Sequence, residues 1–406
     1  MLSRVRQDKL GQILLNIFIV FSTFEIIIKG ILTLREDSLL SVNAIKIGLV
    51  VALIFSIFIT RRLKRMTPKI KEVMIIYLIF FVVLALKLLA INNPSDFTKW
   101  LADNNNFNYL FSFVCFIIII NINVKKESII NTLILSSIVV MGFSFLFFIK
   151  NNYYGLVAPN IIQAYSMGFL NKIRMMSVFA SPNHAGLYFV MVYLIVDYRE
   201  KNSFKMLFNI YRFLLVICIM LTLSRTAIGI LFLYLIIKIL KHKSGRKVKK
   251  VLITTSIIGI ASTAVWIAIT KYNVYFFSAS YIQADNRWVK WQVALEYIKK
   301  YWVIGVPFNI KVQMYTYVNS VITIVEFSDN LFLEIASRFG AILILAVFAF
   351  IIKNLYVDFR EKNITDINKI LFFIISSMTT GSIHFTVPMI LFIVYCTKFH
   401  GLKYER

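Results

Sequence analysis

Acidic residues are scarce in this sequence of 406 residues, since 19 Asp and Glu stand against 45 Lys and Arg, a formal net charge of +26. All charged residues together make up 16% of the chain, whereas a soluble domain usually has about 25%. No polar stretch is long enough to bury a core of its own, which excludes a separate soluble domain. The basic residues lie mostly in short segments between apolar runs, as in the cytoplasmic loops of membrane proteins, so they do not indicate a nucleic-acid partner.

Residues for metal and nucleotide chemistry are also few. The three cysteines, Cys115, Cys218 and Cys396, all lie in apolar runs, where cysteine is a small core residue rather than half of a disulfide. No His-Glu or Cys pair has metal-ligand spacing, and no Gly-rich turn ends in Lys followed by Ser or Thr. The sequence therefore argues against a metalloprotease or an ATP-driven pump, and no cofactor is expected.

Apolar residues, in contrast, make up 59% of the chain. They recur in runs of about 20 residues, each long enough to cross a hydrocarbon core of about 30 Å. We predict an all-α, polytopic membrane protein with about 12 transmembrane helices and a large external loop that carries short amphipathic helices. The predicted helices are 12–33, 44–60, 71–91, 107–123, 129–149, 184–198, 206–223, 225–240, 250–270, 330–352, 367–382 and 384–398.

The loop charges predict how the chain is oriented. The basic loops fall on the same side as the N-terminus, which places both termini of this multi-pass plasma-membrane protein in the cytoplasm. The first apolar run has no small-residue cleavage site and is interpreted as a retained helix. We divide the chain into an N-terminal transmembrane bundle (1–150), a core (151–366) that includes the external loop 271–329, and C-terminal helices with a cytoplasmic tail (367–406).

The stretch LTLSRTAIG places Arg225 inside an apolar run that covers residues 206–240. One helix of that length would measure about 50 Å, too long for a single crossing. The run therefore predicts a hairpin whose turn lies within residues 222–226. Arg225 then lies at the external membrane boundary rather than at the bilayer centre, where a charge costs about 2.5–3.5 kcal/mol. Lys87 and Lys238 are interpreted as residues that snorkel from helix ends.

Two long segments, 150–183 and 271–329, are predicted to be external, and loops of this size are disproportionately functional. In the second, ADNRWVKWQVALEYIKK has apolar residues at intervals of three and four, which predicts an amphipathic helix. Its apolar face consists of Trp288, Trp291, Ala294, Leu295 and Ile298. The aromatic residues suit a helix that lies at the membrane interface.

This topology brings several polar residues to the external surface. The predicted substrate-binding residues are Arg174, Asn183, Arg225, Arg287, Trp288 and Asn330, and the predicted catalytic residue is Asp329. Arginine suits phosphate because its planar fork donates two parallel hydrogen bonds and stays charged. A carboxylate can accept the proton of an attacking sugar hydroxyl, and tryptophan rings offer flat faces to sugars. Arginines at the headgroup level would thus suit a lipid-linked pyrophosphate without any metal.

Each of these residues also has a simpler interpretation. Arg174 and Arg225 can be interfacial cations, and Arg287 can belong to a solvated helix face. Asp329 and Asn183 can be helix caps, and the tryptophans can be ordinary interface aromatics. Only the combination of these residues indicates a function.

The combination resembles the O-antigen ligase and polymerase superfamily of bacterial polysaccharide assembly over about residues 170–350. TLSRTAIGILFLYL is similar to the Ser-Arg helix of that family, and FASPNHAGLYFVMV to its Pro-Asn helix start. DNRWVKWQVALEYIKKYWVIGVPF resembles its loop segment, with Pro307 in place of the second glycine of the terminal turn. SDNLFLEIASRFG resembles the helix after the loop, with Asp329 where ligases typically carry histidine.

The resemblance implies a metal-independent, inverting glycosyltransferase at the outer face of the plasma membrane, with polyprenyl-pyrophosphate-linked oligosaccharide as donor and acceptor. It implies that Arg225 and Arg287 hold the pyrophosphate and that Asp329 takes the place of the histidine. An Asp-Asn pair is more similar to the polymerases, so we expect polymerisation of O-antigen-type or capsule-type repeat units. Membrane lipids are further partners, no nucleic acid is expected, and a chain-length regulator is left open.

Two alternatives stay open. A flippase or transporter belongs to a different class, and a ligase that transfers the glycan to another acceptor is closer. Transporters often contain internal repeats and helices broken at mid-membrane, whereas this chain shows no convincing repeat. An outward pocket shared by Arg225, Arg287 and Asp329 would favour the enzyme, and a charged central pore would favour transport.

Overall fold

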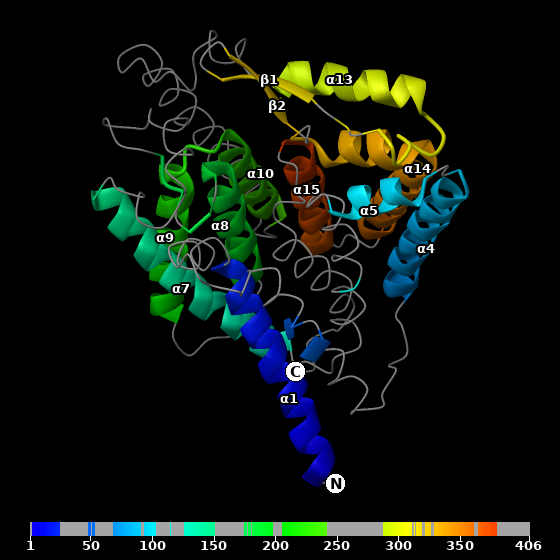
Figure 1. The fold of residues 1–406 in the computed structure, drawn as a ribbon. Coiled ribbons are helices and arrows are strands. Elements are labelled where there is room, and N and C mark those ends of the chain that lie inside the picture. The colour runs from blue at the N-terminus through cyan, green and yellow to red at the C-terminus, as the bar shows by residue number, and fades with distance from the viewer. Residues whose placement is uncertain are drawn as a thin grey trace, which may run out of the picture.

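The computed structural model of the chain is mainly helical, as predicted (Figure 1). It describes residues 2–24, 48–49, 51–52, 68–90, 93–102, 114, 126–150, 174–176, 178–179, 181–197, 205–241, 287–310, 312, 314–318, 321–325, 329–360 and 364–379. Within these ranges, 3 helices are long and apolar enough to cross a membrane, at Lys71–Leu89, Glu127–Ile149 and Leu331–Asp358. Shorter apolar helices lie at Leu10–Phe21, Pro182–Val196 and Met206–Leu221. The length and apolar composition of these helices are those of a membrane protein.

The helices are α1 (Leu2–Thr23), α4 (Pro68–Leu89), α5 (Pro94–Ala102), α7 (Lys126–Lys150), α8 (Pro182–Asp197), α9 (Lys205–Leu221), α10 (Arg225–Lys241), α13 (Arg287–Lys300), α14 (Leu331–Arg360) and α15 (Ile364–Thr379). Two short antiparallel strands, β1 (Met314–Val318) and β2 (Val321–Val325), form a hairpin. Both strands are rich in β-branched and aromatic residues, which suit a strand. The hairpin corrects the prediction of an all-α chain. The described residues confirm a mainly helical chain, and the number of about 12 transmembrane helices and the external loop stay predictions.

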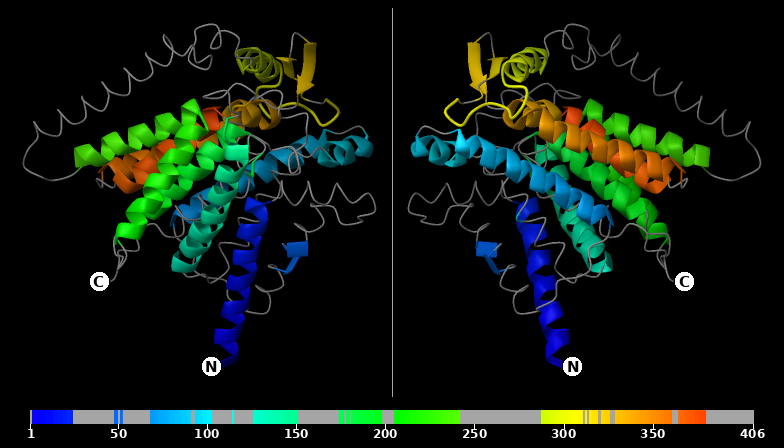
Figure 2. Two further views of the ribbon diagram at one scale, coloured as in Figure 1. Left: turned by 90° about the vertical axis from the view of Figure 1, so that its left-hand side faces the viewer. Right: turned by 90° about the vertical axis from the view of Figure 1, so that its right-hand side faces the viewer.

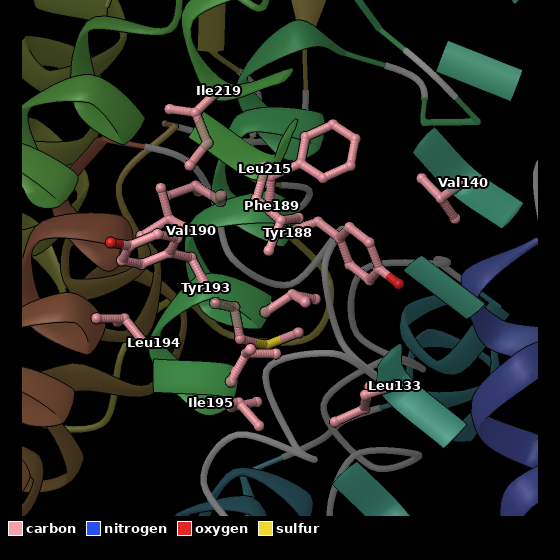
Figure 3. Packing of buried hydrophobic residues seen from close by; sticks show 14 of the residues in the cluster. Leu133, Val140, Tyr188, Phe189, Val190, Tyr193, Leu194, Ile195, Leu215 and Ile219 are labelled. Carbon is pink, nitrogen blue, oxygen red and sulfur yellow. The ribbon is translucent and has the colours of Figure 1, made fainter. Parts of the chain in front are cut away.

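The larger core surrounds α8. Every residue from Ala185 to Val196 is buried, as expected for a helix that is apolar on all sides. α8 packs against α7, α9, α10 and α15. Figure 3 shows the ring of Tyr188 pointing toward Leu133 and Val140 of α7, whereas Tyr193 points to the opposite side. α8 is therefore the central helix of this bundle.

A second core lies along α14, which packs against α4, α13 and α15. Phe80 and Val83 of α4, Trp100 of α5 and Phe339 of α14 are among its buried residues. α15 joins the two cores, because Phe372 is buried in the first and neighbouring residues of α15 pack against the second. α4 also contributes to both cores, through Val73 in the first and Phe80 in the second, so both α4 and α15 link the bundle around α8 to the α14 region.

α13 and the hairpin lie at one end of the molecule, opposite the N-terminal end of α1 (Figures 1 and 2). α13 packs on α14 and on β1. Ala294 of α13, Val306 and Val312 form a small buried cluster there. This end of the molecule carries several of the predicted site residues.

The predicted hairpin within residues 206–240 is confirmed, because α9 ends at Leu221 and α10 begins at Arg225. The first helix begins at Leu2 rather than at residue 12. Cys218 is buried and has a free thiol, as predicted. The predicted helices 44–60, 107–123, 250–270 and 384–398 lie outside, or almost entirely outside, the described residues.

α5 was not expected in the segment after α4. Pro94 takes its first position, where a missing N–H costs nothing. The side chain of Asn93 accepts a hydrogen bond from the main-chain N–H of Ser95 at 3.0 Å, so Asn93 acts as the N-cap. Asp96 in the first turn and Lys99 in the last turn match the helix dipole.

Candidate functional site

The turn between α9 and α10 is held by donors from a distant segment. The main-chain N–H of Met175 donates to the carbonyl of Leu221 at 3.1 Å. The guanidinium of Arg174 donates to the carbonyls of Thr222 and Leu223, each at 2.9 Å. The last carbonyls of a helix have no partner inside it, so Arg174, which is buried, satisfies the end of α9.

The start of α10 is equally constrained. The hydroxyl of Ser224 accepts a hydrogen bond from the N–H of Ala227 at 3.4 Å, which makes Ser224 the N-cap. Leu223 before it has a φ of 49°, in the left-handed region that few residues adopt. Gly186 of α8 lies so close that a Cβ there would meet the Cβ of Ala227 at 2.7 Å. Arg225, the first residue of α10, therefore follows a turn that is held by hydrogen bonds from Arg174 and by close packing against α8.

The predicted residues Arg174 and Asn183 are brought together at the start of α8. The side-chain carbonyl of Asn183 accepts a hydrogen bond from the guanidinium of Arg174 at 3.4 Å. The hydroxyl of Ser181 accepts one from the N–H of Asn183 at 3.1 Å, so Ser181 rather than Asn183 caps α8. The contacts of Arg174 favour a role in positioning the turn before Arg225 over a direct contact with substrate.

Asn330 caps α14. Its side-chain carbonyl accepts hydrogen bonds from the N–H groups of Phe332 at 3.0 Å and Leu333 at 3.2 Å. Asp329, one residue earlier, has a φ of 59°, a conformation that Asp and Asn adopt more readily than other side chains. The interpretation of Asp329 as the helix cap is therefore wrong, and its carboxylate is left for another partner.

That partner is Lys290 of α13. Its ammonium donates to the Oδ2 of Asp329 at 2.6 Å, and the two side chains are 9% and 25% exposed. Water screens such a partly buried pair less than it screens a surface pair. The contact joins the first turn of α13 to the residue that lies two positions before α14, 39 residues further along the chain. Lys290 was not among the predicted site residues.

The helix predicted within ADNRWVKWQVALEYIKK is present as α13, which buries one of its sides. Lys290 and Ala294 are its buried residues, whereas Trp288 is 63% exposed and Leu295 is 45% exposed. The small side chain of Ala294 allows a close approach to the neighbouring segments, and the larger Val293 and Tyr297 are partly buried around the same cluster. Trp288 and Leu295 of the predicted apolar face thus lie outside the protein core, and their placement at a membrane interface stays a prediction. The Trp288 ring lies 6.5 Å from that of Trp291.

A tight main-chain contact joins the segment after α13 to α14. The N–H of Val306 donates to the carbonyl of Ser337 at 3.0 Å. Gly340 has a φ of 80° and interrupts the helical geometry of α14. A Cβ on Gly340 would lie 2.2 Å from the carbonyl oxygen of Val303, and one on Gly305 would lie 2.3 Å from that of Arg338. Only glycine fits at both positions.

Lys87 of α4 completes this contact. It is 3% exposed, and its ammonium donates to the carbonyls of Val306 at 2.6 Å and Arg338 at 2.5 Å. The interpretation of Lys87 as a snorkelling residue is wrong, because its ammonium stays inside to bind the main chain at the kink. Lys238, in contrast, is exposed, as expected for a snorkelling residue.

Three further polar residues of α14, in the first turns after Asn330, are buried and were not predicted as site residues. Glu334 is 1%, Ser337 0% and Arg338 4% exposed. Spacings of three and four residues place them on one side of the helix. Ionisable residues inside an apolar helix are costly and usually functional. The polar periodicity of EIASR was the signal that could have revealed them.

The contacts thus form two groups of predicted residues. One contains Arg174, Asn183 and the turn before Arg225, and the other contains Asp329 and Asn330 with the added Lys290. A cavity shared by the two groups stays a prediction. Asp285 and Asn286, which precede α13, lie outside the described residues. Among the described residues, no group of three or more His, Cys, Asp or Glu could hold a metal ion.

Comparison with known families identifies residues 210–348 as a match to the O-antigen ligase family. The matched segment contains the turn before α10, all of α13, the hairpin and the start of α14. It confirms the resemblance to the O-antigen ligase and polymerase superfamily predicted from the sequence. A comparison with curated proteins finds no match.

Proposed function

We propose, from the O-antigen ligase domain at residues 210–348, that this membrane protein is a polysaccharide polymerase. It joins lipid-diphosphate-linked oligosaccharide repeats at the outer face of the plasma membrane, in a multi-pass arrangement with both termini in the cytoplasm. The observation that carries the proposal is this match, because its segment includes Arg225, Arg287 and Asp329 together.

The proposed reaction is an inverting glycosyl transfer. A sugar hydroxyl of the acceptor attacks the anomeric carbon of the donor, and the new C–O bond forms as the bond to the diphosphate breaks. The electron pair of that bond leaves with the diphosphate, and the hydroxyl proton passes to the carboxylate of Asp329. Arg225 and Arg287 stabilise the charge that builds up on the departing diphosphate, so the step requires no metal.

The remaining predicted residues support this reaction. Arg174 and Asn183 fix the turn that carries Arg225, and Asn330 fixes the start of α14 next to Asp329. Trp288 is exposed and offers its ring to a sugar of the donor or acceptor. Small displacements of reacting groups cost large factors in rate, which is why these positioning contacts matter.

A ligase is the second candidate, because the matched family is itself described as O-antigen ligase. A ligase transfers a glycan to a different acceptor, whereas a polymerase joins repeats to one another. Aspartate at position 329, in the place of a histidine, favours the polymerase. The two functions differ in their products, since only loss of a polymerase leaves single lipid-linked units where long chains were made.

The experiment is a polymer ladder from cells that carry Arg225→Ala, Arg287→Ala or Asp329→Ala, with the amount of protein in the membrane checked. We expect loss of long chains and accumulation of single lipid-linked units. Lys238→Ala, on the exposed end of α10, is the matched control and should give a normal ladder. Normal ladders from all three site variants would contradict the proposed reaction.

A further inference from the structure

We propose that Lys290 is a further diphosphate-binding residue of the transfer site, and that its ion pair with Asp329 is the state of the site before the donor binds. The inference rests on the proposed function, because it assigns a residue to the same diphosphate. Donor binding moves the ammonium of Lys290 from the carboxylate to a phosphate oxygen, and Asp329 is then free to accept the proton of the acceptor hydroxyl.

The position of Lys290 on α13 supports this role. Arg287, Lys290 and Ala294 follow one another at intervals of three and four residues, so they share one side of the helix. Ala294 is fully buried against Val306, and Leu333 of α14 packs against the same cluster. This side of α13 therefore meets the start of α14. Arg287 and Lys290 thus lie one turn apart on the side of α13 that meets Asp329, and neighbouring cations of this kind suit an anionic ligand.

The chemistry of lysine also supports it. The ammonium is a compact charge on a flexible stem, so it can exchange one anion for another, whereas the fork of arginine binds a carboxylate in a fixed geometry. A diphosphate carries more negative charge than one carboxylate and attracts the ammonium more strongly at the same distance. The 2.6 Å pair between Lys290 and Asp329 can therefore open toward the donor without leaving the lysine unpaired.

Stability alone does not account for the pair. Taking two charges out of water is costly, and apolar side chains of similar volume often hold two helices together equally well. Asn330 already caps α14, and Ala294 already packs α13 onto its neighbours. A charged pair at this contact is explained by a charged ligand that replaces one of its partners.

The test measures binding of farnesyl diphosphate to the purified full-length protein in detergent by titration calorimetry, with farnesyl monophosphate as the comparison ligand. The variants are Lys290→Met, Lys290→Arg, Asp329→Asn and Arg287→Ala. The control is Lys299→Met, which removes an exposed lysine from the last turn of the same helix. Thermal unfolding of each variant shows that the fold is retained.

We expect Lys290→Met to weaken binding of farnesyl diphosphate about tenfold or more, and Lys290→Arg to weaken it about threefold or less. Asp329→Asn should bind it as tightly as the wild type or more tightly, because the lysine no longer has a competing carboxylate. Lys299→Met should bind it as the wild type does.

Two results would overturn the inference. The first is unchanged affinity in Lys290→Met. The second is an equal loss of affinity in Lys290→Met and Asp329→Asn, which would show that the pair only joins two helices. If Arg287→Ala loses the preference for diphosphate over monophosphate and Lys290→Met keeps it, only this inference fails. If the wild type itself shows no such preference, the diphosphate site of the proposed function fails as well.

Discussion

The starts of α10 and α14 are each held by a cation from a distant segment, but the two cations have different partners. Arg174 donates to the main-chain carbonyls of Thr222 and Leu223. Lys290 donates to the carboxylate of Asp329. A carbonyl in a turn cannot be exchanged without changing the turn, whereas a carboxylate can give up its cation to a ligand or accept a proton. We therefore expect Arg174 to stabilise the turn before α10, and Lys290 to take part in substrate binding.

The largest effect is expected at Gly340, in the kink that brings α14 against the segment after α13. Gly340→Ala adds a Cβ only 2.2 Å from the carbonyl oxygen of Val303, in a residue whose φ is 80°. Steric overlap and left-handed strain together should lower stability by about 3 kcal/mol or more. Thermal unfolding in detergent measures this.

The matched control for Gly340→Ala is Gly229→Ala in α10, where an added Cβ meets nothing within 4 Å. Alanine should leave stability unchanged or raise it by up to about 1 kcal/mol, because it favours a helix. A stable Gly340→Ala variant would show that the kink does not require glycine.

The next effect is expected at Lys87. Lys87→Met removes two hydrogen bonds and leaves the buried carbonyls of Val306 and Arg338 without their donor. The loss should be about 2–4 kcal/mol. Lys238→Met changes an exposed lysine and should stay within about 0.5 kcal/mol of the wild type. Equal melting temperatures of the two variants would contradict the assigned role of Lys87.

A third experiment compares the two cations directly. Arg174→Ala leaves the carbonyls of Thr222 and Leu223 unsatisfied and should cost about 2 kcal/mol of stability, with loss of polymer. Lys290→Met should cost about 1 kcal/mol or less, because the carboxylate that it leaves unpaired is 25% exposed to solvent, and it should also lose polymer. Thermal unfolding and the polymer ladder are measured on the same membranes. A larger loss of stability in Lys290→Met than in Arg174→Ala would reverse the assignment.

The smallest change in stability is expected at the start of α14, where variants of Asp329 and Asn330 should have different effects. Asn330→Ala removes the cap of α14 and should cost about 1 kcal/mol. Asp329→Asn keeps a side chain that tolerates the left-handed conformation, so it should retain stability and lose polymer. The difference is read from unfolding curves and ladders. Unchanged stability in Asn330→Ala would contradict the assignment of the cap to Asn330.

The sequence predicted those features that follow from length and local pattern. A run covering 206–240 is too long for one crossing, so the break before Arg225 could be placed within a few residues. Ser224 is a cap-forming residue before an apolar run, which locates the start of α10. The start of α14 was placed at residue 330, one residue early, because its cap was expected at Asp329 rather than at Asn330. The family resemblance could be predicted because these starts and the segment of α13 occur in a fixed order.

The features that escaped prediction depend on contacts between distant segments. The acceptors of Lys87 are main-chain carbonyls 219 and 251 residues away. Every residue has a main-chain carbonyl, so the sequence does not indicate which of them bind a distant lysine. The burial of Lys290 in α13 was not predicted, because a lysine usually lies at the surface. The approach between Gly305 and Gly340 shows in the sequence only as two unremarkable glycines.

The most direct test of the proposal that both helix starts belong to one site is an experimental structure of the full-length protein with farnesyl diphosphate bound. We predict that its phosphate oxygens lie within hydrogen-bonding distance of Arg225 and Arg287 at once, with the carboxylate of Asp329 beside them. A diphosphate bound at only one helix start, with the other directed into a separate space, would contradict it.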